Sequence, residues 1–489
     1  MKFGFRRPAI VTALSIATLA TAAVVVRATD WPIWGHSPSR NMVSDETGMP
    51  TSFDPGKYKA GTEEIDMATT KNVRWVAKLG SQAYGNTTVA GGKVFIGTNN
   101  ETPRDPSVKG DRGILMCFDE KTGKFLWQLV VAKLGTGKIS DWEFLGICSS
   151  PAIEGDRVYL VTNRCEAVCL DANNGNVVWN FDLRKELGVF PHNISASSPL
   201  IFGDRMVITT ANGVDWTHTK IPNPKAPCLV MLDKKTGKLL GEENVGVAAR
   251  TFHSNWSSPA FGTVNGKGHI IFGAGDGWCY GFDAAETVAK DGINELKELW
   301  RYDCDPPNYR VKDGKQLKYA TFDGPSEVIA TPVFYKNRVY VPIGQDPEHG
   351  EGIGNFSCID ITKGGDITKT GKLWSYDKIH RSLSTPSIVN GLVFVGDFSG
   401  FVHCLDAETG AVNWVYDTKS HIWGSTVAAD GKVYVGTEDG DVIVLEASKT
   451  LNVIKKNDIR SPIYSTPVMA NGTLFIATPT HLYAIENPK

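Results

Sequence analysis

Short runs of alternating apolar and polar residues recur along most of the chain, and they predict a protein built from β-strands. The runs are rich in Val, Ile and aromatic residues and end in turn-forming residues. Eight of them are KVFIGT from residue 93, RVYLVT from 157, RMVITT from 205, HIIFGA from 269, RVYVPI from 338, LVFVGD from 392, KVYVGT from 432 and TLFIAT from 473. A hydroxyl-rich segment such as SSP or STP precedes each run. Eight copies of one pattern indicate a repeating supersecondary unit.

A second motif follows these strands and predicts how each unit continues. An apolar run ends in an acidic residue, and in the clearest copies Gly follows four positions later and Trp eight positions later. These copies are Asp119, Gly123 and Trp127; Asp171, Gly175 and Trp179; and Asp406, Gly410 and Trp414. Asp and Gly at this spacing are typical of a tight turn, in which Asp bonds to nearby backbone and Gly takes a positive φ. Each unit is therefore predicted to contain four antiparallel strands, A to D, with this turn between C and D.

The Trp residues of the motif lie on the predicted outer strand D. A large aromatic side chain at that position can bury itself only against the neighbouring unit. We therefore predict blade-packing roles for Trp75, Trp127, Trp179, Trp300, Trp374 and Trp414.

These units predict an all-β protein, an eight-bladed β-propeller of four-stranded antiparallel blades. The eighth copy has no fourth strand after HLYAIENPK, whereas NVRWVAKL at 72–79 has no unit of its own. We expect this N-terminal strand to complete the eighth blade and close the ring without a free edge. The expected organisation is a signal peptide at 1–28, an N-terminal extension at 29–71 and the propeller at 72–489.

The repeated D-x-x-T-G-x-x-x-W phrase resembles that of the quinoprotein-like (PQQ-like repeat) propeller family, over roughly residues 72–489. This family includes pyrroloquinoline quinone dehydrogenases and outer-membrane assembly lipoproteins. Departures are local: Gly241 stands where Trp is expected, and Glu446 and Ile454 replace Asp and Trp in the seventh copy. The resemblance implies either a binding or scaffold protein or a quinone-dependent oxidoreductase.

The N-terminal residues have the pattern of a secretory signal peptide. Lys2, Arg6 and Arg7 precede an uncharged run from Pro8 to Val26, and a small-residue site ends at Ala28. An uncleaved membrane anchor is the alternative, because the run is nearly long enough to cross a bilayer. With Arg27 the segment carries four cations, so its removal changes the formal charge from −2 to −6. A mildly acidic surface without basic blocks argues against nucleic acid as a partner.

Cysteine positions suggest few disulfides. Four of the nine, Cys117, Cys169, Cys358 and Cys404, occupy one position of the repeat and are expected to be buried apolar residues far apart in space. Cys148 precedes strand A of the second blade and Cys165 lies in its B-to-C turn, on the same face. They form the candidate disulfide, and two separate thiols are the alternative.

Six long insertions fall on one face of the predicted ring, whereas the opposite face carries mostly short turns, except for longer C-to-D segments in the fourth and fifth copies. Chain direction places D-to-A and B-to-C loops on the same side, and the insertions are 99–112, 131–147, 183–195, 211–227, 304–325 and 344–356. Long loops on a rigid scaffold are where binding sites concentrate; capping of the channel is the alternative. The ligand-binding candidates near this mouth are Trp142, Glu143, His192, Asn193, Arg250, His253, Trp256, Glu327, Arg381, Trp423 and Tyr464. Arg for carboxylates and aromatic rings for stacking would suit an anionic, flat or sugar-like ligand.

Two cofactor hypotheses follow. The family resemblance implies pyrroloquinoline quinone with Ca²⁺, held by Glu and Asn, with an Asp base and often an adjacent-cysteine disulfide; this chain has no Cys-Cys and no recognisable dehydrogenase motif. The loop QDPEHGEG at 345–352 could hold a divalent cation, and its candidate ligands are Asp346, Glu348, His349 and Glu351. A solvated acidic loop is the alternative.

We therefore expect an exported, monomeric propeller, periplasmic or extracellular, with no membrane span once the signal is cleaved. It would bind a small molecule or a protein at the long-loop face. The alternative function is a PQQ-dependent alcohol or sugar dehydrogenase, so whether the protein is an enzyme stays open at this point.

Overall fold

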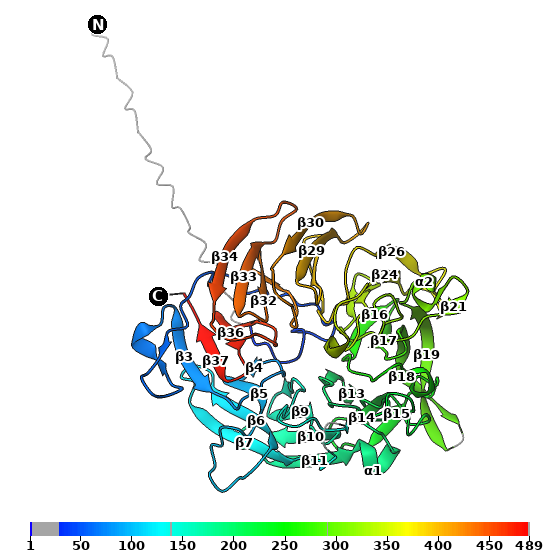
Figure 1. Ribbon diagram of the computed structural model, residues 1–489, viewed down its shortest axis with the longest axis horizontal. Coiled ribbons are helices and arrows are strands. Elements are labelled where there is room, and N and C mark those ends of the chain that lie inside the picture. The colour runs from blue at the N-terminus through cyan, green and yellow to red at the C-terminus, as the bar shows by residue number, and fades with distance from the viewer. Residues whose placement is uncertain (2–28, 137–138, 291, 488–489) are drawn as a thin grey trace.

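Eight four-stranded antiparallel blades stand around a central axis in the computed structural model, which describes Met1 and residues 29–136, 139–290 and 292–487 (Figure 1). The predicted fold class is confirmed. The expected signal peptide at 1–28 lies almost wholly outside the described residues. No helix among the described residues is long and apolar enough to cross a membrane.

The blades follow one another along the chain, each running from the axis outward. Blades 1 to 4 consist of β4 (Thr88–Ala90), β5 (Lys93–Asn99), β6 (Arg112–Asp119) and β7 (Phe125–Ala132); β8 (Ala152–Glu154), β9 (Arg157–Val161), β10 (Glu166–Asp171) and β11 (Val177–Asp182); β12 (Leu200–Phe202), β13 (Arg205–Thr209), β14 (Leu229–Asp233) and β15 (Leu239–Glu242); and β16 (Ala260–Val264), β17 (Lys267–Gly273), β18 (Trp278–Lys290) and β19 (Ile293–Asp303).

Blades 5 to 8 consist of β22 (Val333–Tyr335), β23 (Arg338–Pro342), β24 (Phe356–Asp360) and β26 (Lys372–Tyr376); β27 (Ser387–Val389), β28 (Leu392–Gly396), β29 (Phe401–Asp406) and β30 (Val412–Asp417); β31 (Val427–Ala429), β32 (Lys432–Gly436), β33 (Asp441–Glu446) and β34 (Val453–Asp458); and β35 (Val468–Ala470), β36 (Thr473–Ala477), β37 (His481–Ile485) and β3 (Val73–Lys78). Short elements outside the blades are β1 (Lys57–Tyr58), β2 (Ile65–Asp66), β20 (Val311–Lys312), β21 (Lys315–Gln316), β25 (Gly365–Asp366), the helices α1 (Leu183–Leu187) and α2 (Pro307–Arg310), and the 3₁₀ turns η1 (Met67–Thr69), η3 (Ala248–Arg250) and η4 (Pro347–His349).

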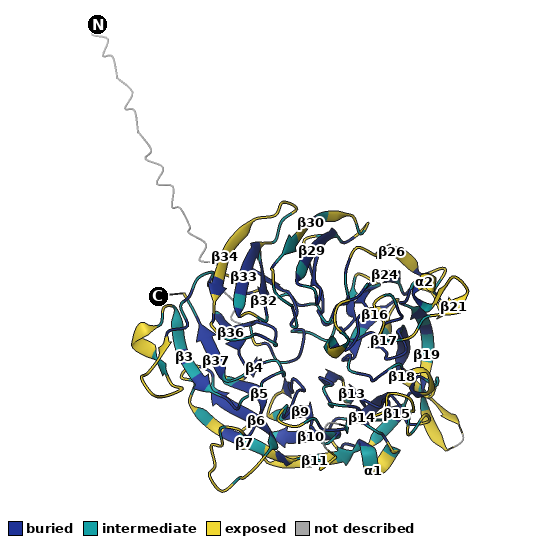
Figure 2. Cartoon of the chain, viewed as in Figure 1, coloured by how far each residue is buried: buried dark blue, intermediate teal, exposed yellow. Residues whose placement is uncertain are grey.

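The ring closes as the sequence predicts. β3 pairs antiparallel with β37, with Trp75 opposite Ala484 and Lys78 opposite His481. The strand that precedes the first blade therefore becomes the outer strand of the last, and β37 is not left as an edge strand. Burial falls from the inner strands to the outer ones, as Figure 2 shows.

The hydroxyl-rich segments form a hydrogen-bonded belt around the channel. In this belt a side-chain oxygen of one blade accepts the backbone N–H of the equivalent residue in the preceding blade; for example, Ser150 N–H donates to Ser198 Oγ at 3.1 Å and Ser198 N–H to Ser258 Oγ at 2.9 Å. Among the described residues this bond is present at seven of the eight steps. The accepting residues are Asn86, Ser150, Ser198, Ser258, Thr385, Ser425 and Thr466. The belt satisfies buried amides and links the blades.

Outer-strand Trp side chains join neighbouring blades. Trp127 of blade 1 is 7% exposed, donates from Nε1 to the carbonyl of Ala172 at 3.1 Å and covers Gly175 in the C-to-D turn of blade 2. Trp75, Trp179, Trp374 and Trp414 donate to the corresponding turn of the next blade in the same way. Trp300 differs, because its Nε1 contacts His269 Nδ1 of its own blade at 3.0 Å.

Blades 3 and 4 replace this Trp contact with an extended hairpin. At Gly241 the outer strand of blade 3 has no large side chain, and Thr287 and Leu296 of blade 4 pack against it. Glu242 forms a parallel bridge to Glu295, so that β15 and β19 join the two blades in one sheet. The departure at Gly241 is thus compensated by the elongated β18 and β19.

Residues 29–46 cross the channel at its A-to-B end, where the blue segment in Figure 1 crosses the ring, and they bond to every blade. Backbone pairs include Trp31 with Val89 of blade 1 and Met42 with Ala428 of blade 7. Arg40 is fully buried, and its guanidinium donates to the carbonyls of Trp34, Ser198 and Pro259. Burial lowers the pKa of Arg40 to about 9. The segment therefore closes one end of the channel.

All nine cysteines are buried free thiols in the structure, so the predicted Cys148–Cys165 disulfide is not formed. Cys148 faces the channel cavity described below, whereas Cys165 packs between blades 2 and 3, its Sγ 3.1 Å from the carbonyl of Thr210. The two lie on the same blade but point toward different neighbours, which the order of strands could not show.

Candidate functional site

A cavity of ≈ 420 Å³ occupies the channel at its long-loop end. Trp34 of the N-terminal segment forms part of its lining and donates from Nε1 to Thr331 Oγ1 at 3.1 Å. The lining also includes hydroxyl residues of the belt and residues of the D-to-A and B-to-C insertions. Because residues 29–46 close the far end, the cavity opens toward the long loops.

Aromatic side chains dominate the wall of this cavity. They are Trp34, Tyr84, Trp142, Trp256, Trp423 and Tyr464. Tyr84 stacks on Tyr464 with ring centres 5.1 Å apart, and Trp423 lies edge-on to Tyr464 at 5.2 Å. Trp423 Nε1 donates to Glu438 Oε2 at 3.1 Å, which fixes its ring. Aromatic walls with few polar groups are typical of small-molecule sites.

The charge of the lining is acidic. Asp346 and Glu348 are its ionisable carboxylates, and no Lys or Arg belongs to the lining as far as the chain is described. Burial raises the pKa of Asp346 above its ordinary value. This lining disfavours an anionic ligand, contrary to the expectation built on Arg250 and Arg381.

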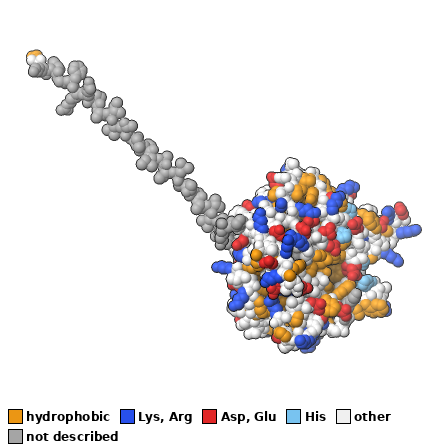
Figure 3. All heavy atoms as spheres, turned by 60° about the vertical axis from the view of Figure 1, so that its left-hand side comes forward, with side chains coloured by type: hydrophobic (Ala, Val, Ile, Leu, Met, Phe, Trp, Pro, Cys, Tyr) orange, Lys and Arg blue, Asp and Glu red, His pale blue; other side chains and the backbone are white. Residues whose placement is uncertain are grey.

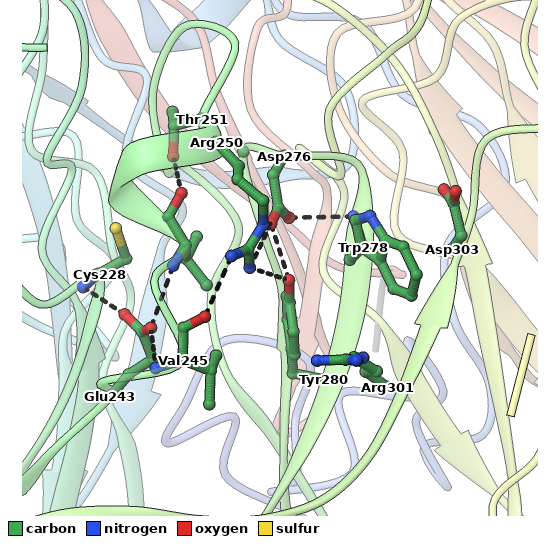
Figure 4. A network of polar contacts seen from close by, with 12 residues as sticks. Cys228, Glu243, Val245, Arg250, Thr251, Asp276, Trp278, Tyr280, Arg301 and Asp303 are labelled. Carbon is green, nitrogen blue, oxygen red and sulfur yellow. Dashed lines mark hydrogen bonds and ion pairs between the residues drawn. The ribbon is translucent and has the colours of Figure 1, made fainter. Parts of the chain in front are cut away.

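Arg250 points away from the cavity into a polar network beneath the loops. Its Nε donates to Asp276 Oδ2 at 3.1 Å and its Nη2 to Tyr280 OH at 2.8 Å (Figure 4). Tyr280 OH in turn donates to the same carboxylate at 2.7 Å. The buried carboxylate of Asp276 is thereby paired, and the guanidinium has a structural role.

The Arg381 side chain also has a structural role, because it is bonded to loop carbonyls. It is 2% exposed, and its guanidinium donates to the carbonyls of Thr321, His349, Gly350 and Glu351. The side chain holds two insertions, 304–325 and 344–356, against blade 6. It does not belong to the cavity lining.

Glu327 is fully buried beside the cavity. Its Oε1 accepts Ser254 N–H at 2.8 Å and its Oε2 accepts Tyr319 OH at 3.3 Å. Burial raises the pKa of Glu327 well above its ordinary value. Glu143 is exposed and outside the lining, whereas Trp142 and Asn193 belong to it.

Two insertions and the segment that precedes β16 bring three histidines together next to this cavity. His192 and His253 are buried, and their ring centres are 4.3 Å apart. His218 is exposed, and its ring centre lies 5.1 Å from that of His192 and 4.7 Å from that of His253. The ring centre of Trp256, which is part of the cavity wall, lies 5.2 Å from that of His253.

The four ligands proposed for a cation in the loop 345–352 do not converge on one point. Asp346 Oδ2 lies 3.6 Å from His253 Nδ1, and the His349 ring centre lies 5.3 Å from that of His253. Glu351 Oε1 instead lies 3.6 Å from His421 Nε2, and Glu348 faces the cavity. The four side chains of this loop therefore point to three different places: the histidine group, the cavity and His421 before blade 7.

Sequence reasoning missed Trp34, Cys148 and His218 as residues of this region. The hydroxyl pattern before each strand A could have located the cavity wall, because the belt residues line it. No pattern marked Trp34, which reaches Thr331 across 297 residues of sequence.

Fold and cavity together define a PQQ-like repeat propeller with a channel closed at one end. A sequence profile of the family described as outer membrane protein assembly factor BamB matches residues 68–303 and 308–416. The chain belongs to this family, and the resemblance seen in its repeats is confirmed.

Known relatives cover most of the chain at low identity. The outer membrane protein assembly factor BamB of Xanthomonas campestris is 22% identical over 424 residues, which span 78% of this chain and 98% of that protein. The crystal structure of BamB from Moraxella catarrhalis matches with a TM-score of 0.55 and 14% identity, over 85% of this chain and 97% of that one. A quinohemoprotein alcohol dehydrogenase from Pseudomonas putida HK5 matches with a TM-score of 0.64 and 12% identity, over 94% and 81%. At these identities the structural likeness shows the fold.

The cavity does not fit pyrroloquinoline quinone. This cofactor carries three carboxylates, and a buried anion requires cationic or hydrogen-bonding partners. The described lining offers Asp346 and Glu348 instead, while Arg250 and Arg381 are bound elsewhere. Carboxylates of the lining and of the cofactor would repel each other.

Proposed function

We propose that this protein is an exported binding module that holds an uncharged ring-bearing group in the aromatic cavity at its long-loop face. The group belongs to a small molecule, such as a sugar, or to a side chain presented by a protein partner. The observation that carries the proposal is the cavity itself, a blind space of ≈ 420 Å³ walled by aromatic side chains. Its size lies in the range of small-molecule sites.

The physical argument concerns stacking and charge. A ring inserted between Trp256, Trp423 and Tyr464 would bury apolar surface on both faces, while belt hydroxyls and Asn86 offer hydrogen bonds at its edge. The two carboxylates favour neutral or cationic groups over anions. The signal-like N-terminus and the family of outer membrane assembly factors both support a place outside the cytoplasm.

On the face that Figure 3 shows, acidic and basic side chains are interspersed rather than gathered by sign. That pattern gives no extended basic surface on this face. It is consistent with recognition through the cavity rather than through a broad electrostatic patch.

Ligand titration followed by tryptophan fluorescence tests the proposal. A panel of neutral oligosaccharides and uncharged aromatic compounds is expected to include ligands that change the emission, and Trp256→Ala should weaken their binding at least about tenfold, since stacking aromatics carry much of such affinities. The matched control is Trp216→Ala, because Trp216 is 70% exposed in the insertion 211–227 and outside the lining. A ligand whose affinity depends on Trp216 and not on Trp256 would contradict the assignment.

The alternative function is a quinone-dependent dehydrogenase, which the structural likeness to the Pseudomonas putida enzyme suggests at the level of fold. The acidic lining of the cavity argues against this alternative, because it would repel the carboxylates of the quinone. Calorimetric titration with pyrroloquinoline quinone, with and without Ca²⁺, is expected to give no heat and no change in Tm. Tight, Ca²⁺-dependent binding would make the dehydrogenase the leading hypothesis.

A further inference from the structure

We propose that His192, His218 and His253 form a binding site for a divalent transition cation of the zinc and copper class, at the edge of the cavity. One ligand atom from each of the three histidines lies within 4.8 Å of the others. Within the described part of the chain, no other set of three or more His, Cys, Asp or Glu residues converges in this way. The inference goes beyond the proposed ligand binding and does not depend on it.

Backbone bonds of one short segment hold the two buried histidines. His192 Nδ1 contacts the carbonyl of Val214 at 2.7 Å, and the N–H of Val214 donates to the carbonyl of His253 at 2.9 Å. Gly213 makes this approach possible, because a Cβ there would lie 2.8 Å from His192 Cβ and 2.4 Å from the His253 carbonyl oxygen. A turn that begins at Asp215 then brings the His218 ring next to those of His192 and His253. In this turn His218 N–H donates to the carbonyl of Asp215.

The bond to Val214 also determines which nitrogen of His192 is available. A ring nitrogen that contacts a carbonyl carries the proton, so Nδ1 is the donor and Nε2 keeps a lone pair. This arrangement, a backbone carbonyl on one ring nitrogen and a free second nitrogen, is the usual setting of a metal-binding histidine. His192 is 1% exposed, and its Nε2 has no hydrogen-bond partner among the described residues.

Among the described residues, His253 also has an unpartnered Nε2, although no backbone carbonyl contacts its other ring nitrogen. It is 2% exposed, and neither ring nitrogen forms a hydrogen bond within the described structure. Its Nδ1 faces Asp346 Oδ2 at 3.6 Å. A buried imidazole without partners is unfavourable by itself, and a bound cation would supply the missing interaction.

Asp346 is a positioning residue in this site. On metal binding, a carboxylate this close to Nδ1 would accept its proton in a hydrogen bond, orient the ring and leave Nε2 for the metal. Asp346 is itself held in place, since its Oδ1 accepts the N–H of Glu348 at 2.9 Å and caps η4. The loop 345–352 thus supports the centre without supplying its main ligands.

The donor set suits a transition cation. Each of the three imidazoles can offer one ring nitrogen, and these atoms lie within 4.8 Å of one another. Neutral imidazoles are preferred by Zn²⁺ and Cu²⁺, whereas Ca²⁺ and Mg²⁺ prefer oxygen ligands.

Binding requires a small contraction of the site. Bonds of about 2.0–2.1 Å in a tetrahedral zinc centre place ligand nitrogens about 3.3 Å apart. The three ligand atoms lie within 4.8 Å of one another, so the rings must move closer. His218 is the residue free to do so, because it is exposed and lies on a long insertion. Three histidines leave a fourth position toward solvent or the cavity.

Metal titration of the full chain, purified without a histidine tag and stripped with a chelator, tests the proposal. We expect one Zn²⁺ or Cu²⁺ per chain at micromolar or lower concentration and no competition from excess Ca²⁺ or Mg²⁺. His218→Ala should weaken binding at least about tenfold, a loss comparable to those of metal-site variants in general. The Tm of the metal-free protein should not change, because His218 is exposed.

The matched control is His421→Ala, a half-exposed histidine that contacts Glu351 and Glu438 and lies outside the cluster. It should leave affinity unchanged. Asp346→Asn should weaken binding about tenfold while the electron paramagnetic resonance spectrum of bound Cu²⁺ keeps the same nitrogen couplings. His218→Ala should remove one of these couplings. Absence of stoichiometric binding in the wild-type chain, or affinity unchanged in His218→Ala, would overturn the proposal.

Discussion

Replacement of Gly175 by Ala tests the claim that outer-strand Trp residues hold the blades together through close contact with the next turn. Gly175 has φ +76°, and a Cβ at this position would lie 2.5 Å from Cε3 of Trp127. Two costs are therefore expected. An L-residue in the left-handed region costs about 1–2 kcal/mol, and overpacking against a buried ring costs about 1–3 kcal/mol. The free energy of unfolding should fall by about 2–5 kcal/mol in all.

A double-mutant cycle with Trp127→Ala separates the two costs. Trp127→Ala alone should destabilise by about 3–5 kcal/mol, since it removes a buried ring and its bond to the Ala172 carbonyl. In that background Gly175→Ala should cost only its conformational share, about 1–2 kcal/mol. The coupling between the two sites is therefore expected to be about 1–3 kcal/mol.

Urea denaturation followed by circular dichroism provides the assay. Gly155→Ala is the matched control, because Gly155 has φ +59° in a turn of the same blade and a Cβ there would meet nothing within 4 Å. It should show the conformational cost alone. The reasoning would be refuted if Gly175→Ala cost no more than Gly155→Ala, or cost the same with and without the Trp127 ring.

Three further predictions concern the closed end of the channel and blade 6. Arg40→Ala should lower the free energy of unfolding by at least about 3 kcal/mol, because it leaves three buried carbonyls without a donor; urea denaturation measures it, and a loss below about 1 kcal/mol would contradict the bonding described. Trp34→Ala should destabilise by about 3–5 kcal/mol and weaken any ligand of the cavity, whereas Trp34→Phe should retain most stability; equal effects in both variants would argue against a role as cavity floor. The pKa of His380 should be raised above its ordinary value by its hydrogen bond to Asp397 and, less strongly, by Glu351. Its contribution to stability is then present below about pH 6.5 and lost as the pH rises through the raised pKa. His380→Gln should abolish that part of the pH dependence, by at most about 1 kcal/mol for a partly exposed pair, and nuclear magnetic resonance titration of His380 showing a lowered pKa would contradict the assignment.

The repeat could be predicted from the sequence because its determinants are local. Alternation of apolar and polar positions, a Gly such as Gly123 or Gly175 in the tight turn of the clearest copies, and a Trp four residues after it all act within one blade or between adjacent blades. Chain direction then placed the six insertions on one face without any knowledge of their structure. Even the closing strand around Trp75 followed from counting, since eight copies required a fourth strand that the C-terminal segment did not contain.

The candidate site was predicted only in part, because side-chain direction depends on contacts that sequence spacing does not encode. Trp256, Trp423 and Tyr464 face the cavity as expected. Arg250 and Arg381 do not, since each finds nearer partners in Asp276 and in loop carbonyls. With both guanidinium groups bound elsewhere, the expected preference for anions loses its basis, and we propose an uncharged ligand instead.

The sequence by itself determined the eight blades, the closing strand and the face that carries the long loops, since these depend on short periodic patterns and on chain direction. Only the tertiary structure decided that residues 29–46 close the channel and that Trp34 meets Thr331. It also decided that His218 lies next to His192 and His253. These contacts join segments tens to hundreds of residues apart, and their geometry is set by how loops pack on the finished ring.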